Sequence, residues 1–328
     1  MKEYKITTAD TNQRLNKFVG RYLSAAPQSF VYKMLRKKNI TLNDKKATGA
    51  EMLNEGDVVK FFLADETIDK FRVQLGAKSA DLEAKRAKQV KIAYEDENII
   101  VAVKPKGLLS HPDKIGGASL IFNILGYLKA KSEYNSKMFT PALANRLDRN
   151  TTGLVMCGKN LQALQALNKM IKDKQLDKYY VAIVSGHVQE QGRLENYFVK
   201  DQAKNKIKIV TAKQNKDSDA ELLLTEYTPI STFKRFGKTF TYIKLHLITG
   251  KPHQLRAHMA HIGHPIVGDP KYGNASVNKW VLDKFNIEHQ MLHAQTIYFR
   301  DTVEPLSYLQ GKTIEANLPK SFSEFLEI

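Results

Sequence analysis

The sequence predicts an α+β fold with a mixed, mostly antiparallel sheet and helices packed around it. Two observations support this class. Segments with strand patterns outnumber helical ones, and many neighbouring strands are joined by short turns. A chain of 328 residues is also too long for one small core. We therefore expect two domains, the second much larger than the first.

The first 66 residues have the pattern of a compact module with two short helices and a small sheet. Apolar residues recur at helical spacing over residues 12–24, and Ser29 begins a second short helix. The strand-like segments ITLNDK and VVKFFL follow, bounded by turn residues. Residues 67–90 are charged, without a clear apolar face, and we expect a linker there.

The larger domain is expected over residues 91–328. It begins with a strand, an acidic turn and a second strand in KIAYEDENIIVAVKP. Helical patterns cover residues 118–131 and 160–175, and the second of these is amphipathic. Further strands are predicted in LVMCG, KYYVAIVSGHV, AELLLTEYTPI and FTYIKLHLI.

Charge and composition indicate a partner that is a polyanion. Lys and Arg total 51 against 34 Asp and Glu, which gives a net charge of +17 and a pI near 9.6. Such proteins attract polyanions, of which nucleic acid is the commonest. No apolar run approaches the roughly 20 residues needed to span a bilayer, and no amphipathic basic anchor stands out, so we expect no membrane partner. The single cysteine, Cys157, and the polar first residues favour a cytoplasmic protein.

The segment NRLDRNTTG, residues 145–153, holds the first candidate for chemistry. Asp148 lies between Arg146 and Arg149 just before a Thr-Thr-Gly turn. Nearby guanidiniums favour the ionised carboxylate, which can act as a nucleophile or base at neutral pH. On this segment alone, a salt-bridged turn residue is an equally good interpretation.

A second segment, TGKPHQLRAHMAHIGHPIVGDPKYG (249–273), is rich in histidine. The spacing of His258 and His261 suits zinc ligands on a helix. However, the chain has no HExxH pattern and only one thiol, and Lys251 and Arg256 oppose a bound cation. We therefore expect no metal, with the histidines acting as hydrogen-bonded structural residues or phosphate contacts. P-loop, GxGxxG and GxSxG patterns are also absent.

Together these segments resemble the RluA-type family of pseudouridine synthases. The family pattern HRLDRxTSGL is matched by NRLDRNTTGL, and TGRxHQIRxHxxxIGHPIxGDxxYG by TGKPHQLRAHMAHIGHPIVGDPKYG. KxYxAxVxG is matched by KYYVAIVSG and NKPxGLxxHP by VKPKGLLSHP. The resemblance covers residues 91 to about 300. The first 66 residues resemble the α-L RNA-binding domain of a ribosomal protein, which often precedes this catalytic domain.

The resemblance implies an RNA pseudouridine synthase. Such an enzyme breaks a glycosidic bond, turns the uracil and forms a carbon–carbon bond, so this isomerisation needs no cofactor. The target base has to be flipped out of its stack. We expect RNA as the partner, large-subunit ribosomal RNA first and tRNA second, and a monomeric enzyme.

The resemblance also assigns roles to site residues. Asp148 matches the essential aspartate, Arg256 the basic residue paired with it, and Tyr180 the tyrosine that stacks on the uracil and assists proton removal from carbon 5. Arg146 matches the arginine that takes the place of the displaced base, and Leu255 would form an apolar wall of the pocket. Asn145 stands where the family usually has His, and we interpret it as a tolerated positioning residue.

Basic side chains of the first module are candidates for RNA binding, namely Arg14, Lys17, Lys33, Arg36, Lys37 and Lys38. The alternative is an ordinary solvated helix face. Two other functions stay open at this point: a catalytically silent RNA-binding or ribosome-assembly factor with the same fold, and a metal-dependent hydrolase built on the histidines.

Overall fold

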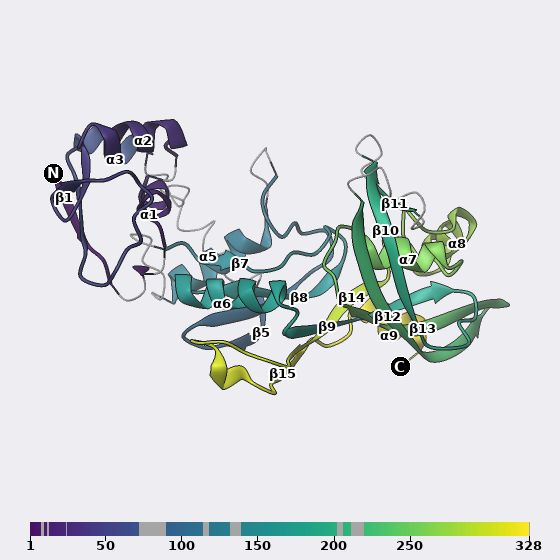
Figure 1. Ribbon diagram of the computed structural model, residues 1–328. Helices are drawn as coiled ribbons and strands as arrows, with labels where there is room; N and C mark the ends of the chain where they lie inside the picture. The colour runs from purple at the N-terminus through teal and green to yellow at the C-terminus, as the bar shows by residue number, and fades with distance from the viewer. Residues whose placement is uncertain are drawn as a thin grey trace. The chain divides into compact units, whose positions relative to one another are not determined.

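The computed structural model describes residues 1–7, 10–11, 13–23, 25–71, 90–113, 118–131, 139–201, 206–210 and 220–327. The chain forms two compact units (Figure 1). One, here called the N-terminal unit, consists of Met1–Gln89 with Asn123–Ala142 and Gly158–Gln162. The other, the large unit, consists of Val90–Phe122, Leu143–Cys157 and Ala163–Ile328.

A four-stranded antiparallel sheet and three helices form the first 71 residues. The strands, in the order β1-β4-β2-β3, are β1 (Lys2–Lys5), β4 (Val58–Phe61), β2 (Ile40–Leu42) and β3 (Lys45–Lys46). The helices are α1 (Leu15–Tyr22), α2 (Gln28–Arg36) and α3 (Asp65–Phe71). Apolar faces of all three enclose one core, to which they contribute Phe18, Leu35 and Ile68. The two predicted helices and short strands of this module are therefore present.

Helix α3 crosses the predicted end of the first domain at residue 66. Its Ile68 is fully buried in the N-terminal core, so the segment after residue 66 is held there by apolar packing. Residues 72–89 of the predicted linker lie outside the described residues. The domain boundaries at 66 and 91 stay a prediction.

The large unit is built on a mixed sheet in the order β11-β10-β12-β13-β9-β14-β8-β6-β5, with β15 paired to β14 and β7 to β8. The strand bounds are β5 (Lys91–Glu95), β6 (Ile99–Lys104), β7 (Ala142–Leu143), β8 (Thr152–Gly158), β9 (Leu176–Ser185), β10 (Gly192–Asp201), β11 (Lys206–Val210), β12 (Glu221–Arg235), β13 (Lys238–Leu247), β14 (Leu292–Phe299) and β15 (Thr313–Glu315). β14 and β8 pair in parallel, whereas β9 pairs antiparallel with both β13 and β14. The mixed, mostly antiparallel α+β prediction is confirmed.

Helices cover this sheet in separate places (Figure 1). Their bounds are α6 (Leu161–Lys172), α7 (Gln254–His261), α8 (Ala275–Phe285), the short 3-10 helix η3 (Ser307–Leu309) and α9 (Lys320–Leu326). A further helix, α5 (Leu120–Ala130), begins in the large unit, and its residues from Asn123 onward belong to the N-terminal unit. α6 packs through Leu167 and Met170 on the core of β6 and β8. α8 and α9 pack on β9 and β13, and Ala257 of α7 packs against β10 to β12. No helix in the part of the chain described is long and apolar enough to cross a membrane.

The backbone conformation at Gly153 and its closeness to Ala294 explain why the NRLDRNTTG segment ends in a glycine. It has φ of 114°, and a Cβ there would lie 2.2 Å from the carbonyl oxygen of Ala294. Only glycine allows β8 to approach β14 this closely. The approach brings the loop before β8, which carries Asp148, beside the centre of the sheet.

Candidate active site

Asp148 lies in a loop whose backbone is fastened from two sides. The Oγ of Ser110 donates to the carbonyl of Leu147 and accepts from its N–H, both at 3.0 Å. Lys104 is fully buried, and its Nζ donates hydrogen bonds to the carbonyl of Arg149 at 2.8 Å and to the carbonyls of Pro105 and Leu108. Burial lowers the pKa of Lys104 to about 7, and the charge of Asp148 acts in the opposite direction. The loop that presents Asp148 is thus held by groups from the β6 end of the sheet.

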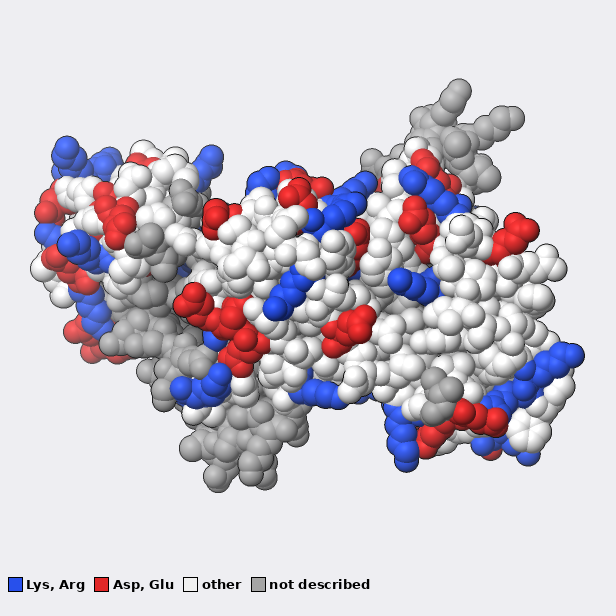
Figure 2. Space-filling model, turned by 90° about the horizontal axis from the view of Figure 1, so that it is seen from below, with Lys and Arg blue, Asp and Glu red and all other residues white. Residues whose placement is uncertain are grey.

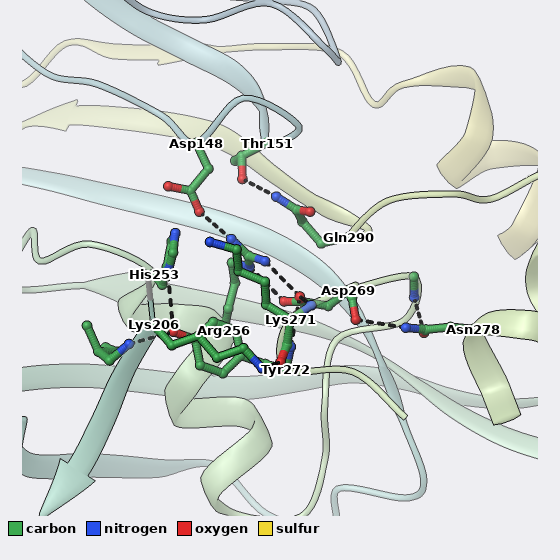
Figure 3. A network of polar contacts seen from close by, with 12 residues as sticks. Asp148, Thr151, Lys206, His253, Arg256, Asp269, Lys271, Tyr272, Asn278 and Gln290 are labelled. Carbon is green, nitrogen blue, oxygen red and sulfur yellow. Dashed lines mark hydrogen bonds and ion pairs between the residues drawn. The ribbon is translucent and has the colours of Figure 1, made fainter. Parts of the chain in front are cut away.

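A chain of three charged side chains forms the centre of the site (Figure 3). Nη1 of Arg256 on α7 donates to Asp148 at 2.8 Å, while its Nε and Nη2 donate to the two oxygens of Asp269, each at 2.7 Å. Exposure decreases along this chain, since the side chains of Asp148, Arg256 and Asp269 are 30%, 5% and 0% exposed. Asp148 is therefore the end of the chain that a substrate can reach.

The interpretation of Asp148 from its sequence neighbours is corrected here. Within the described ranges its ion-pair partner is Arg256, 108 residues later, and not Arg146 or Arg149. Both neighbouring arginines are exposed to solvent. Arg146 and Arg149 border the same hollow as Asp148 without forming an ion pair with it, so adjacency in sequence does not create the pair.

Electrostatics fixes the charge state of the buried pair. Burial alone raises the pKa of Asp269, but hydrogen bonds and charge from Arg256 and the N–H groups of Lys271 and Tyr272 outweigh it, so the pKa lies below its ordinary value. Burial alone lowers the pKa of Arg256, and its two carboxylate partners more than reverse this. Both groups are ionised at neutral pH, and Arg256 is held rigidly toward Asp148.

A cavity of about 230 Å³ adjoins this chain. The predicted site residues on its wall are Asn145, Arg146, Asp148, Tyr180, Leu255 and Arg256. The structure thus brings together all six residues predicted for catalysis and substrate binding. One end of the Asn145 amide is engaged with the backbone, because its Oδ1 accepts a hydrogen bond from the N–H of Met156 at 2.8 Å.

Tyr180 is buried in the wall of this cavity, with 6% of its surface exposed. Burial raises its pKa, and the nearby charge of Asp148 raises it further. The side chain is therefore a neutral phenol at physiological pH. A neutral phenol offers a flat ring and a hydrogen-bond donor, but it is a poor proton acceptor. This favours the stacking role of Tyr180 over its role in proton removal.

Asp148 and Arg256 also border a second hollow of about 590 Å³. Several basic or neutral-imidazole groups line it, among them His111, Arg146, Arg149, His253 and Lys271. The smaller cavity suits one base, and the wider hollow beside it carries the cations that suit a phosphate backbone.

Two residues of the site, Asp269 and Lys178, had no role in the sequence prediction, and His253 was expected only as a structural residue or a phosphate contact. Asp269 lies in the Gly-Asp-Pro tripeptide of residues 268–270, and the glycine before it has a positive φ. The carboxylate beside this glycine was the signal in the sequence that could have pointed to Asp269. Lys178 is 9% exposed, lines the smaller cavity and forms no ion pair with described residues, and burial lowers its pKa. It precedes Tyr180 by two residues on β9, so both side chains face the same side of the sheet. His253 precedes the first residue of α7 with a left-handed φ of 54°, and its side chain makes no capping hydrogen bond. Its Nδ1 lies 3.2 Å from the hydroxyl of Tyr272.

Two of the remaining histidines of the 249–273 segment have structural partners, and the third, His261, is exposed. Nδ1 of His258 is 2.9 Å from the Thr225 hydroxyl, and Nδ1 of His264 is 3.0 Å from the carbonyl of Ser185. Burial lowers the pKa of His258 to about 4, so it is neutral. Among the residues placed by the structure, no group of three metal-binding side chains occurs.

The basic residues predicted to bind RNA all lie on or beside α1 and α2 of the N-terminal unit. Each of Arg14, Lys17, Lys33, Arg36, Lys37 and Lys38 is exposed. On the face drawn in Figure 2, lysines and arginines are scattered among carboxylates and do not form one continuous patch. Any contact with a polyanion on that face therefore depends on local groups of cations.

Comparison with known proteins agrees with the fold. A family model described as RNA pseudouridylate synthase matches residues 98–261. The solved human protein RNA pseudouridylate synthase domain containing 4 superposes with a TM-score of 0.57 at 22% identity, covering 75% of this chain and 95% of that one. The large unit therefore has the pseudouridine synthase fold.

Curated relatives extend this agreement over most of the chain. Ribosomal large subunit pseudouridine synthase C of Vibrio cholerae is 28% identical over 307 residues, which cover 94% of this chain and 89% of that protein. An uncharacterised RNA pseudouridine synthase of Mycoplasma genitalium is 31% identical, with coverage of 90% and 88%. Ribosomal large subunit pseudouridine synthase D of Borreliella burgdorferi is 30% identical, with coverage of 77% and 74%.

The chain belongs to the RNA pseudouridylate synthase family, in its RluA-type branch, because the family model covers half of it and the relatives cover most of it. It is an isomerase that acts on RNA. The resemblance seen in the sequence is confirmed, and the interpretations as a silent RNA-binding factor or a metal-dependent hydrolase are not favoured.

Proposed function

We propose that this pseudouridine synthase modifies specific uridines of large-subunit ribosomal RNA, with Asp148 as the group that attacks or deprotonates the target nucleoside. The main support for this role is the position of the Asp148 carboxylate. Arg256 holds it at the wall of a base-sized cavity that Tyr180 also lines. The choice of RNA is supported by the names of two relatives, which are ribosomal large subunit enzymes.

In this proposal each site residue has a separate task. The uridine leaves its stack and enters the cavity, at a cost of a few kcal/mol. Arg146, exposed at the cavity rim, takes the vacated place in the RNA, and Tyr180 and Leu255 contact the extruded uracil. The bond from N1 to the ribose breaks, the uracil turns, and carbon 5 bonds to the ribose. Carbon 5 then gives up its proton and N1, which no longer bonds to the ribose, takes one up, so atoms balance without an external reagent.

Replacing Tyr180 by Phe separates stacking from proton transfer. The ring is retained, so RNA affinity should not change, and conversion should slow by only about 2- to 13-fold, the loss of one neutral hydrogen bond. Single-turnover conversion of RNA by wild type and by Tyr180→Phe measures this. A slowing of a thousandfold would mean that the hydroxyl itself transfers the proton, contrary to its raised pKa.

The exposed cations of α1 and α2 are proposed to bind RNA phosphates. Arg36→Glu should weaken RNA binding and reduce the slope of log affinity against log salt by about 0.7 to 0.9 for each phosphate that the variant no longer neutralises. Conversion of bound RNA should be unchanged. Lys46→Glu is a matched control, because Lys46 is also exposed in this unit but lies on β3. Equal salt slopes for wild type and Arg36→Glu would remove this face from the RNA interface.

The target RNA is tested by mapping pseudouridines in total RNA from cells with and without the gene. We expect sites in large-subunit ribosomal RNA that disappear with the gene and return with the wild-type copy but not with Asp148→Asn. Loss of sites in tRNA alone would overturn the choice of RNA and leave the enzyme assignment in place.

A further inference from the structure

A small hollow between α1 and α2 lies outside the site described so far. It has a volume of about 220 Å³ and is bordered by Asn16, Lys17, Gly20, Arg21, Gln28 and Tyr32. Helical spacing explains its shape: Asn16 with Gly20, and Lys17 with Arg21, are pairs four residues apart on α1. The volume is below the range for drug-sized ligands, so it suits a group no larger than one base.

Tyr32 gives the hollow an exposed aromatic wall. It is 45% exposed, and its hydroxyl accepts a hydrogen bond from Nδ2 of Asn16 at 2.7 Å. That bond fixes the orientation of the ring without covering its face. Flat faces of this kind bind unstacked nucleic acid bases.

Arg21 brings a half-buried cation to the same hollow. Its Nε has no hydrogen-bond partner, and the charge of Asp10 offsets only part of the cost of burying the guanidinium. A half-buried guanidinium loses hydration, and an acceptor from a ligand would restore it. The carbonyl and ring-nitrogen edges of bases are such acceptors.

Gly20 leaves the floor of the hollow open. It lies inside α1, where glycine lowers helix stability, yet a Cβ at this position would meet nothing within 4 Å. Packing therefore does not require glycine here, whereas a larger side chain would fill the hollow.

From these features we propose that the hollow between α1 and α2 binds one unpaired base of the RNA, stacked on Tyr32 with its polar edge toward Arg21. The proposal rests on the proposed RNA-binding role of this unit and adds a base-binding subsite to it. Phosphate contacts position RNA without regard to its bases, whereas this subsite requires a nucleotide that is free of pairing.

The test compares Tyr32→Ala and Gly20→Met in the full-length enzyme. The probes are an in vitro transcript of large-subunit ribosomal RNA and a fully paired RNA duplex. Both variants should bind the transcript about 5- to 150-fold more weakly, the range for one stacked base, and should bind the duplex as wild type does. Phe62→Ala is the matched control, because Phe62 is 46% exposed in the same unit and does not border the hollow. It should leave both affinities unchanged.

Wild-type affinity for the transcript in Tyr32→Ala or in Gly20→Met would overturn the proposal, and so would an equal loss on the duplex. Gly20→Met removes no contact and no charge, and its melting temperature should not fall, so weaker binding cannot come from misfolding. If the wild type forms pseudouridine in the transcript and both variants bind the transcript as tightly as the wild type, the base-binding subsite is refuted and the proposed RNA target stands. If the wild type forms none, the proposed RNA target fails instead.

Discussion

Asp148→Asn is expected to reduce pseudouridine formation by about a hundredfold to ten-thousandfold, because one positioned acid or base contributes roughly 10² to 10⁴ in rate and Asp148 is the one carboxylate among the described residues that line the smaller cavity. The substitution keeps the size of the side chain and a hydrogen-bond acceptor for Arg256. Folding and RNA binding should therefore be near wild type. Single-turnover conversion, RNA affinity and the unfolding free energy are measured together.

Asp173→Asn is the control for this experiment. It makes the same chemical change at a carboxylate on the exposed turn after α6, where Asp173 pairs with Lys169. Its conversion rate should equal that of wild type. If Asp148→Asn converts RNA at the wild-type rate, Asp148 is not the reacting group and the mechanism proposed for this site is wrong.

Asp269→Asn is expected to have the largest effect on stability. It removes a charge that is fully buried against Arg256 and leaves the guanidinium without its bidentate partner. Breaking a buried ion pair in this way costs about 3–5 kcal/mol. Denaturant unfolding should show that loss, whereas Asp148→Asn should lose little, since Arg256 then still has Asp269. Conversion should also fall, because Arg256 no longer holds Asp148 firmly.

Acid pH gives a second measurement of the same pair. Because the pKa of Asp269 is lowered in the folded protein, the unfolded chain binds more protons once the pH falls below about 4, the ordinary aspartate value. Its contribution to stability is complete above that pH and is lost as the pH falls through the folded pKa. Asp269→Asn should lack this component. An unfolding free energy equal to wild type at neutral pH would show that the Arg256–Asp269 contact contributes no net stability.

The two ends of this ion-pair chain thus have different consequences. The buried end, Asp269, supports folding and the orientation of Arg256. The exposed end, Asp148, makes little difference to folding and is available for chemistry. On this proposal, a site can orient a reactive carboxylate without burying it beyond reach of its substrate.

Much of the fold was predictable because local patterns decide it. The amphipathic pattern over 160–175 became α6, and KYYVAIVSGHV became most of β9, since spacing of apolar residues fixes which face is buried. β10 was not among the predicted strands. Its sequence, GRLENYFVKD, alternates weakly, and its place is decided by pairing with β11 and β12.

The site, like the fold, was only partly predictable from the sequence. The residue types and motif spacing in the sequence determined the class of enzyme, the aspartate and the tyrosine. The motif resemblance also implied the pairing of Asp148 with Arg256. Only the tertiary structure decided that the arginines on either side of Asp148 form no ion pair with it, and that Asp269 lies behind Arg256. That arrangement depends on β8 lying beside β14, β14 beside β9, and α7 returning from a distant part of the chain. Such contacts are set by the packing of whole elements, which no short stretch of residues encodes.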